Sequence, residues 1–242
     1  MESPSTRGRL SRPLVLRAAI ALADRDGLGA LTMRSLAEDL GVEPMALYRY
    51  ADGKQALLDG MIEAFYAEVN AEVNEAAEVN EAVHPEPAPA GDTDRAPAGG
   101  TDWRAELHRI AYAFYQVAEA HPAVFPLVAT RPLSLPLARR PTPMLRLNER
   151  VLTLLTQASL DDPATLRLYR AVVGWVLGYL LVDKRQVIDN PDEPEPLLRL
   201  GLHRLPAEQY PRLRAVATLL TDHDPKAELA AGLDLLLDHL TR

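Results

Sequence analysis

The stretch from Leu31 to Lys54 constrains the fold more than any other part of the chain, and it reads L-T-M-R-S-L-A-E-D-L-G-V-E-P-M-A-L-Y-R-Y-A-D-G-K. Thr32 offers a side-chain oxygen that can cap a helix, and Gly41 can end that helix with a positive φ. Pro44 suits the first turn of a second helix, expected to end near Tyr50. Two short helices across a tight turn predict a helix-turn-helix, although an ordinary helical hairpin in an all-α core has the same spacing.

This stretch is also similar to a known family. The run G-V-E-P-M-A-L-Y-R-Y-A-D-G-K-Q-A-L-L-D, which begins at Gly41, resembles the DNA-binding domain of the TetR family of bacterial repressors. The resemblance extends from about Leu14 to Val69 and implies an all-α protein whose N-terminal helix-turn-helix reads DNA. Motif and side-chain chemistry together give eight candidate DNA-binding residues: Thr32, Arg34, Met45, Ala46, Tyr48, Arg49, Tyr50 and Lys54.

The candidates divide into base readers and phosphate binders. Arg34 matches the family's base-reading arginine and could bond to O6 and N7 of a guanine, a contact worth ~1–3 kcal/mol of discrimination. Met45 and Ala46 could pack on thymine methyl groups, and the tyrosines, the threonine and the lysine resemble phosphate binders. Arg49 could serve either role. The alternative for both arginines is that they are solvated surface charges.

Net charge argues weakly against DNA binding. The chain carries 26 Lys or Arg and 34 Asp or Glu, a formal charge of −8, whereas nucleic-acid binders usually have a basic excess. Residues 1–60 hold eight basic and eight acidic residues, so the rest of the chain carries the excess. Phosphate contacts depend on local charge, so DNA binding remains the prediction. Arg7 and Arg9 could add contacts from an N-terminal tail, or the tail could be unstructured.

Periodicity and composition divide the chain into four parts. The predicted parts are a helix-turn-helix domain over 1–60, a connecting helix extension over 61–83, a disordered linker over 84–100 and a helical ligand-binding and dimerisation domain over 101–242. The extension contains A-E-V-N-E-A twice in succession, over 71–76 and 77–82, and its alanines and glutamates favour helix. The Pro-rich linker that follows cannot continue a helix. Extension and linker form an insertion relative to the family, either a neutral duplication or a functional acidic tether.

The C-terminal part predicts further helices. Their starts are expected at Thr101, Thr142, Asp162 and Asp224. The ten residues of Ala123–Pro132 are expected to be irregular. In the last helix, the inner stripe is expected to consist of Leu229, Leu233, Leu236 and Leu240.

An uninterrupted apolar run covers Ala171–Val182. Hydrophobic groups on every side of a helix need both a core and a partner to cover them. Gly174 and Gly178 would permit a second backbone to approach closely. We therefore expect a two-fold homodimer held by an antiparallel four-helix interface. The run is too short to span a bilayer, and no membrane contact is predicted.

The C-terminal part resembles the tetracycline-repressor type of ligand-binding domain. The matching pieces are W-R-A-E-L from Trp103, E-A-H-P from Glu119, A-T-R-P from Ala129, V-G-W-V-L-G-Y-L-L-V-D from Val173 and L-A-A-G-L-D-L-L-L from Leu229. The resemblance implies a small-molecule effector that binds in the core and weakens affinity for the operator. The candidate ligand-binding residues are Asn70, Ile110, Phe114, Gln116, Leu127, Thr130, Trp175 and Tyr179.

Departures from that subgroup indicate a different ligand. Leu127 stands where the tetracycline repressor has a magnesium-binding histidine, and Val182 stands where it has an acidic residue of the metal–water network. Leucine and valine cannot coordinate Mg²⁺, which needs oxygen donors. We therefore predict no metal, no cofactor and a largely apolar, polycyclic ligand. For each candidate, plain core packing is the alternative.

Other functional classes find little support. The chain has no cysteine, and its six histidines form no H-E-x-x-H motif. Nucleophile-elbow, phosphate-loop and dinucleotide-binding motifs are absent as well, so no enzyme is predicted. With no apolar N-terminal run, a cytoplasmic, nucleoid-associated protein is expected. The prediction is a ligand-released repressor that binds a palindromic double-stranded operator as a homodimer. The alternative is a helical interaction protein that is regulated by a protein partner without a ligand.

Overall fold

The computed structural model describes residues 10–83, 102–131, 135–184, 189–221 and 224–240, and these contain helices and turns but no strand. The predicted all-α class is confirmed. The predicted N-terminal tail, the linker over 84–100 and the helix start at Thr101 lie outside the described residues.

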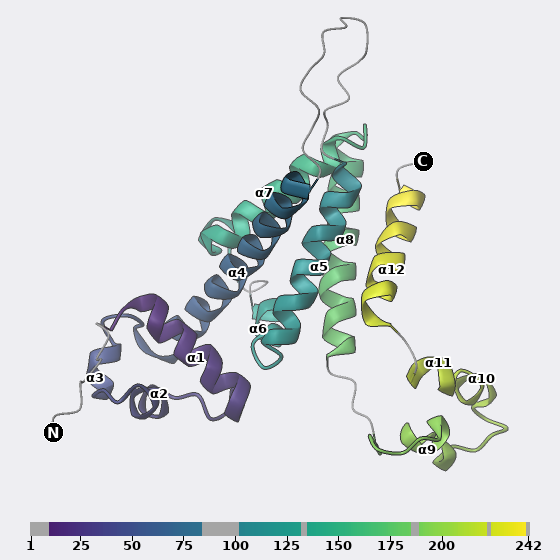
Figure 1. The fold of residues 1–242 in the computed structure, drawn as a ribbon, viewed down its shortest axis with the longest axis horizontal. Helices are drawn as coiled ribbons and strands as arrows, with labels where there is room; N and C mark the ends of the chain where they lie inside the picture. Colours follow the sequence, from purple (N-terminus) through teal and green to yellow (C-terminus); the bar gives the residue numbers. More distant parts are fainter. Residues whose placement is uncertain (1–9, 84–101, 132–134, 185–188, 222–223, 241–242) are drawn as a thin grey trace, which may run out of the picture.

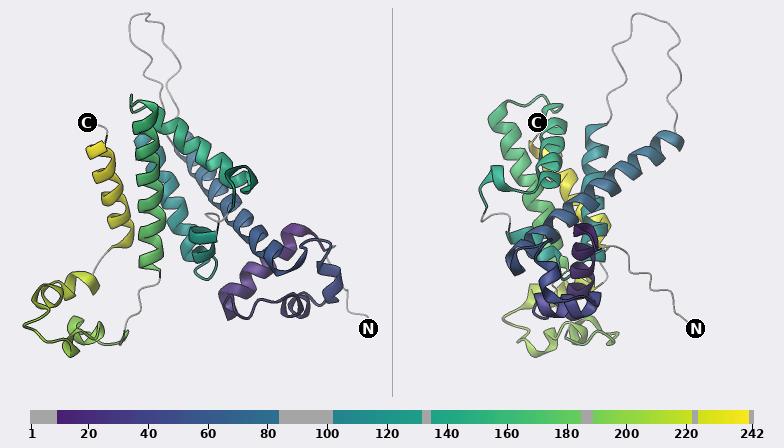
Figure 2. Two further views of the ribbon diagram at one scale, coloured as in Figure 1. Left: turned by 180° about the vertical axis from the view of Figure 1, so that it is seen from behind. Right: turned by 90° about the vertical axis from the view of Figure 1, so that its left-hand side faces the viewer.

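The helices form a small N-terminal lobe, a longer body and a second small lobe. In chain order they are α1 (Arg12–Asp26), α2 (Met33–Leu40), α3 (Pro44–Leu47), α4 (Gly53–Val83), α5 (Trp103–Ala120), α6 (Phe125–Thr130), α7 (Thr142–Thr156), α8 (Asp162–Asp183), α9 (Pro196–Arg199), α10 (Pro211–Ala215), α11 (Ala217–Thr221) and α12 (Pro225–Leu240). Short 3₁₀ turns cover Leu137–Arg139 and Leu202–Arg204. Helices α1–α3 form the N-terminal lobe, α4 leads from it into the body, and α9–α11 form a lobe between α8 and α12 (Figure 1). Figure 2 shows from behind that α12 lies beside α8, away from the N-terminal lobe.

The helix-turn-helix forms where the sequence predicts it. The Thr32 side chain accepts a hydrogen bond from the Ser35 N–H at 3.0 Å, and the Ser35 hydroxyl accepts one from the Thr32 N–H at 2.9 Å, which together make a capping box. Gly41 ends α2 with φ 63°. The second helix is shorter than predicted and ends at Leu47, because the Tyr50 N–H bonds to the Leu47 carbonyl at 2.9 Å and closes a turn there.

Helix α4 belongs to both the lobe and the body, as predicted. Its inner stripe of Leu58, Ile62, Phe65 and Val69 is buried, and the helix continues without a break to Val83. Gly60 allows α1 to approach closely, since a Cβ there would lie 2.6 Å from a methyl group of Leu16. The duplicated segment therefore extends a single helix.

Two predicted helix caps and one stretch that was predicted to be irregular differ from the structure. Asp102 caps α5 by accepting the Arg104 N–H at 3.0 Å, and Asp161 caps α8 by accepting the Ala164 N–H at 2.8 Å. Helix α8 thus begins at Asp162 as predicted but is capped by the preceding residue, and α5 is capped by Asp102 instead of Thr101. The stretch expected to be irregular contains α6, because Pro126 occupies the first turn of a helix, where proline is tolerated.

The inner stripe of α12 also differs from the prediction. Leu229, Leu233 and Leu237 are buried, whereas Leu236 is only half-buried. The buried leucines are thus spaced four and four on the side of α12 that packs mainly on α8. Asp224 caps this helix as predicted, accepting the Lys226 N–H at 3.0 Å.

A buried charge cluster joins the helices of the body. Glu106 on α5 is 3% exposed and forms ion pairs with Arg109 and with Arg150 of α7. Arg150 also donates a hydrogen bond to the Asn74 side chain on α4 at 2.8 Å. The cluster therefore fixes α4, α5 and α7 together.

Helices α8 and α12 meet through an indole. The Trp175 N–H donates to the Leu229 carbonyl at 3.0 Å, and a Cβ at Gly232 would lie 2.0 Å from the ring. On the outer faces, Val182 is 71% and Leu235 is 73% exposed. These two helices therefore leave apolar side chains uncovered in a single chain.

One helix of the described residues is long and apolar enough to cross a membrane by length and composition alone, although the twelve-residue apolar run within it is too short. Helix α8 has 22 residues and its most apolar window has a mean hydropathy of 1.3. The helix is longer than the twelve-residue apolar run, because it continues beyond the run on the N-terminal side. In the structure α8 contacts α5, α6, α7 and α12.

Candidate DNA-binding and ligand-binding sites

Most of the predicted DNA-binding side chains are exposed on the N-terminal lobe. The exposed ones are Thr32, Arg34, Met45, Tyr48, Arg49 and Lys54, and the other two, Ala46 and Tyr50, are half-buried. Met45 on α3 is 75% and Tyr48 is 45% exposed, while Leu47 between them is fully buried. The short second helix is thus anchored by one leucine and presents its remaining surface to solvent.

Besides Thr32 in the capping box, three of these side chains already have partners. The Arg34 guanidinium pairs with Glu38 at 2.9 Å, but both are well exposed, so the pair is weak and Arg34 can exchange it for another acceptor. The Tyr50 hydroxyl donates to the Leu10 carbonyl at 2.7 Å, and the Lys54 ammonium donates to the Leu28 carbonyl at 3.4 Å. Tyr50 in particular supports the fold of the lobe.

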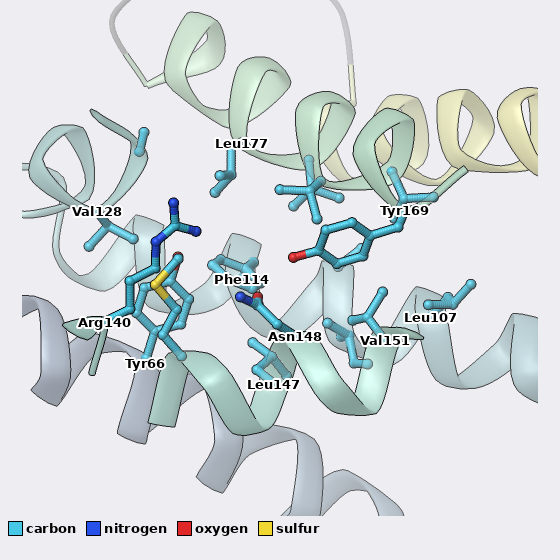
Figure 3. Close-up of a pocket in the computed structure, with 17 residues that line it drawn as sticks. Tyr66, Leu107, Phe114, Val128, Arg140, Leu147, Asn148, Val151, Tyr169 and Leu177 are labelled. Atoms are coloured by element: carbon cyan, nitrogen blue, oxygen red, sulfur yellow. The ribbon is translucent and has the colours of Figure 1, made fainter. Parts of the chain in front are cut away.

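The body contains an apolar cavity between α4, α5, α6, α7 and α8 (Figure 3). Its volume is about 100 Å³, and about 760 Å³ of space is free of protein atoms when its open mouth is included. The lining residues are Tyr66, Leu107, Ile110, Ala111, Phe114, Val128, Ala129, Arg140, Met144, Leu147, Asn148, Val151, Tyr169, Val172, Val173, Val176 and Leu177. Most of them are aliphatic or aromatic, which suits a hydrophobic ligand.

Two of the predicted ligand-binding residues, Ile110 and Phe114, line this cavity. Asn70 does not, because its amide donates to the Tyr66 carbonyl at 2.7 Å and the Pro143 carbonyl at 3.0 Å and so ties α4 to α7.

The other five predicted ligand-binding residues also lie outside the cavity lining. The Thr130 hydroxyl donates to a carbonyl within its own helix, and Leu127 packs against the core. Gln116 lines a separate shallow groove beside α4. Trp175 and Tyr179 lie on the α12 side of α8, with the Tyr179 hydroxyl 3.3 Å from a Glu228 carboxylate oxygen.

Four polar side chains of the cavity are not among the predicted ligand-binding residues. They are Tyr66, Arg140, Asn148 and Tyr169. Burial raises the pKa of Tyr66 and of Tyr169 above its ordinary value, and the positive charge of Arg140 opposes both shifts, so the two phenols stay neutral hydrogen-bonding groups. Of these four, only Tyr66 could have been predicted from the sequence, because it lies one helical turn before the candidate Asn70 and so on the same face of the helix.

Ion pairs fasten the N-terminal lobe to the body. Arg131, which follows α6, pairs with Asp59 of α4 at 2.7 Å. His121, at the end of α5, lies 2.8 Å from the Asp24 carboxylate on α1 and 3.1 Å from the Glu68 carboxylate on α4. Along the chain, the cavity residues Val128 and Ala129 are therefore only two or three residues from Arg131, which contacts the start of α4.

An exposed helix-turn-helix joined through one helix to a domain with an apolar cavity defines a ligand-binding DNA-binding regulator. The family profile described as "Bacterial regulatory proteins, tetR family" matches residues 15–61, and the one described as "Tetracyclin repressor-like, C-terminal domain" matches residues 96–242. The chain belongs to the TetR family of transcriptional regulators, with a C-terminal domain of the tetracycline-repressor type. It is a transcriptional repressor with a ligand-binding C-terminal domain.

Individual relatives agree with this assignment. The chain is 33% identical over 164 residues to the HTH-type transcriptional repressor DrrR1 of Streptomyces coeruleorubidus. The matched residues make up 68% of the chain but only 50% of that relative. It is 26% identical to the Escherichia coli tetracycline repressor protein class C, over 97% of the chain and 92% of that protein. A crystal structure of a possible TetR family regulator from Streptomyces coelicolor A3(2) superposes with a TM-score of 0.69 at 28% identity, covering 95% and 98% of the two chains.

Proposed function

We propose that the protein is a homodimeric repressor that binds a palindromic operator and releases it when a largely apolar, polycyclic molecule enters the cavity. The observation that carries this proposal is that the cavity and the helix-turn-helix share α4. Tyr66 lines the cavity from this helix, and Leu57 and Leu58, at its start, are buried in the lobe. A ligand that moves α4 therefore moves the reading helix.

The proposed contact with DNA uses the exposed side chains of the lobe. Arg34 at the start of α2 would read a guanine, and Met45 on α3 would pack on a thymine methyl group. Tyr48, Arg49 and Lys54 are also exposed and would contact phosphates. A two-fold dimer would present the two reading helices about one helical turn of DNA apart, ~34–36 Å.

The proposed dimer contact uses the outer faces of α8 and α12. Gly174 and Gly178 are exposed on α8, and nothing lies within 4 Å of a Cβ built on either. With Val182 and Leu235 they leave a surface on which a second chain could pack its own α8 and α12. Covering that surface is the reason to expect a dimer.

Release of the operator would pass through α6 as well as α4. Val128 lines the cavity from α6, and Arg131 directly after this helix pairs with Asp59 near the start of α4. A ligand seated against Phe114 and Val128 would displace both helices relative to the body. The two reading helices of the dimer would then lose the spacing of the half-sites.

A gel shift on the DNA that flanks the protein's own gene tests the repressor proposal. We expect a specific complex with the wild type and a loss of affinity of about tenfold or more with Arg34→Ala, which corresponds to the ~1–3 kcal/mol of a bidentate base contact. Arg146→Ala is the matched control, because Arg146 is also exposed but lies on α7 in the body. The absence of any specific complex would favour the interaction-protein alternative.

A thermal-shift measurement tests the ligand class. Polycyclic compounds such as anthraquinones should raise the melting temperature equally in EDTA and in Mg²⁺, because Leu127 and Val182 offer no oxygen donor at the positions where the tetracycline repressor holds its metal. Stabilisation that occurs only with Mg²⁺ would contradict this part of the proposal.

A further inference from the structure

Arg140 is out of keeping with the rest of the cavity. It lies just before α7 and is the one charged side chain among the 17 described residues that line the cavity. Its Nε is buried and has no hydrogen-bond partner, and no carboxylate of the described residues forms an ion pair with it. By contrast, Arg150 of α7 is paired with the buried Glu106.

Arg140 as a whole is half-buried, but a buried guanidinium N–H without an acceptor is costly, because that N–H has lost hydration and gained no hydrogen bond. The neighbouring polar groups do not supply a negative charge. Tyr66 and Tyr169 keep their protons, since burial raises the pKa of both phenols, and Asn148 is neutral. The cavity therefore holds a positive charge that an acidic ligand could neutralise.

The geometry makes the polar groups convergent. Figure 3 shows the Arg140 guanidinium on one side of the cavity, the Tyr169 hydroxyl pointing toward it from the other side and the Asn148 amide between them. Aliphatic side chains such as Val151 and Leu177 fill the remaining walls. This arrangement suits a flat apolar molecule with one acidic group at its edge.

We propose that the natural effector is an organic anion, an apolar polycyclic or aromatic acid whose carboxylate is bound by Arg140, with Tyr169 and Asn148 as additional hydrogen-bond donors. This inference rests on the proposed function and names the chemical class of its ligand. A guanidinium binds a carboxylate through two parallel hydrogen bonds, so Arg140 fixes orientation as well as charge.

The anion site also bears on release. Tyr66 of α4 lies close enough to Arg140 for the guanidinium to oppose the shift in its pKa. A carboxylate held by Arg140 therefore sits beside the helix that leads to the N-terminal lobe. An uncharged analogue can fill the apolar part of the cavity but lacks the group that would be drawn to this position.

The test compares matched acid and amide probes on the full-length protein. Isothermal titration measures the binding of anthraquinone-2-carboxylic acid and of anthraquinone-2-carboxamide to the wild type, to Arg140→Gln and to Arg140→Lys. We expect the acid to bind the wild type at least about tenfold more tightly than the amide, the size expected of one charge-assisted hydrogen-bonded pair. Arg140→Gln should remove this preference by weakening the acid alone, and Arg140→Lys should restore part of it.

Three results would overturn the inference. The first is that the wild type binds the acid and the amide with equal affinity. The second is that Arg140→Gln lowers the affinity for both probes equally, and the third is that the wild type binds neither probe. Tyr169→Phe provides an independent check, because it should weaken the acid about threefold or more without removing the charge. Operator binding by the wild type and Arg34→Ala does not involve the cavity, so failure of the anion site and failure of the repressor proposal give different results.

Discussion

Gly232→Ala is the substitution whose cost follows most directly from the structure. The added Cβ would lie 2.0, 2.4 and 2.7 Å from three atoms of the Trp175 ring, which is rigid and must move as a whole. Moving it breaks the hydrogen bond from the indole N–H to the Leu229 carbonyl at 3.0 Å. The α8–α12 contact therefore loses both its packing and its polar link.

The magnitude can be worked from three contributions. Overpacking a tight contact costs about 1–3 kcal/mol and the lost hydrogen bond about 0.5–1.5 kcal/mol, while alanine in place of glycine in a helix returns about 1 kcal/mol. The expected net loss in the free energy of unfolding is about 2 kcal/mol, within a range of about 0.5–3.5 kcal/mol. Urea unfolding followed by circular dichroism at one fixed protein concentration measures it.

Trp175→Phe supplies the control, because the ring atoms in the way belong to the benzo ring that phenylalanine lacks. In that background Gly232→Ala should cost much less or become favourable, giving a strongly non-additive double-mutant cycle. The same cost in both backgrounds, or a wild-type-like stability of Gly232→Ala itself, would refute the reasoning.

Three further outcomes are expected. Glu106→Gln should lower the free energy of unfolding by about 3 kcal/mol, measured in urea, because it leaves two arginines beside a neutral group; a change of less than ~1 kcal/mol would contradict the cluster's role. Stability should fall as the pH rises above the ordinary tyrosine pKa of 10.0, since burial raises the pKa of Tyr66 in the folded state and only the unfolded chain loses this proton. Tyr66→Phe should flatten that decline in unfolding measured between pH 8 and pH 11, and an unchanged slope would exclude this phenol as its source. His121→Ala should loosen the lobe by removing its contacts with Asp24 and Glu68, so that limited proteolysis cuts between lobe and body sooner than in the wild type.

The sequence sufficed where the determinants of structure are local. Thr32, Gly41 and Pro44 each act on the few residues beside them, so the helix-turn-helix and its exposed surface could be predicted from a short run. Leu58 to Val69 on α4 were likewise identified from helical spacing alone.

The cavity depends on packing between distant segments, and there the prediction was less complete. Trp175 is predicted to line the ligand site, but its ring lies on the other side of α8, where Gly232 of α12 leaves room for it. Arg140 lies in a stretch without periodicity, and only the fold brings it to Tyr169. The position of neither side chain can be predicted from the residues within one helical turn of it.

The ion pairs between lobe and body have a consequence for how operator affinity depends on salt. Arg12–Glu63 and Arg131–Asp59 are partly exposed, so added electrolyte screens them while it also competes for DNA phosphates. A plot of the logarithm of operator affinity against the logarithm of salt concentration would then have a slope with two contributions. One comes from the ions displaced from DNA, and the other from the weakening of the ion pairs between the lobe and the body. The number of phosphate contacts calculated from that slope would therefore be too high. A variant in which these ion pairs are replaced by uncharged residues would give a shallower slope, which reports the phosphate contacts alone.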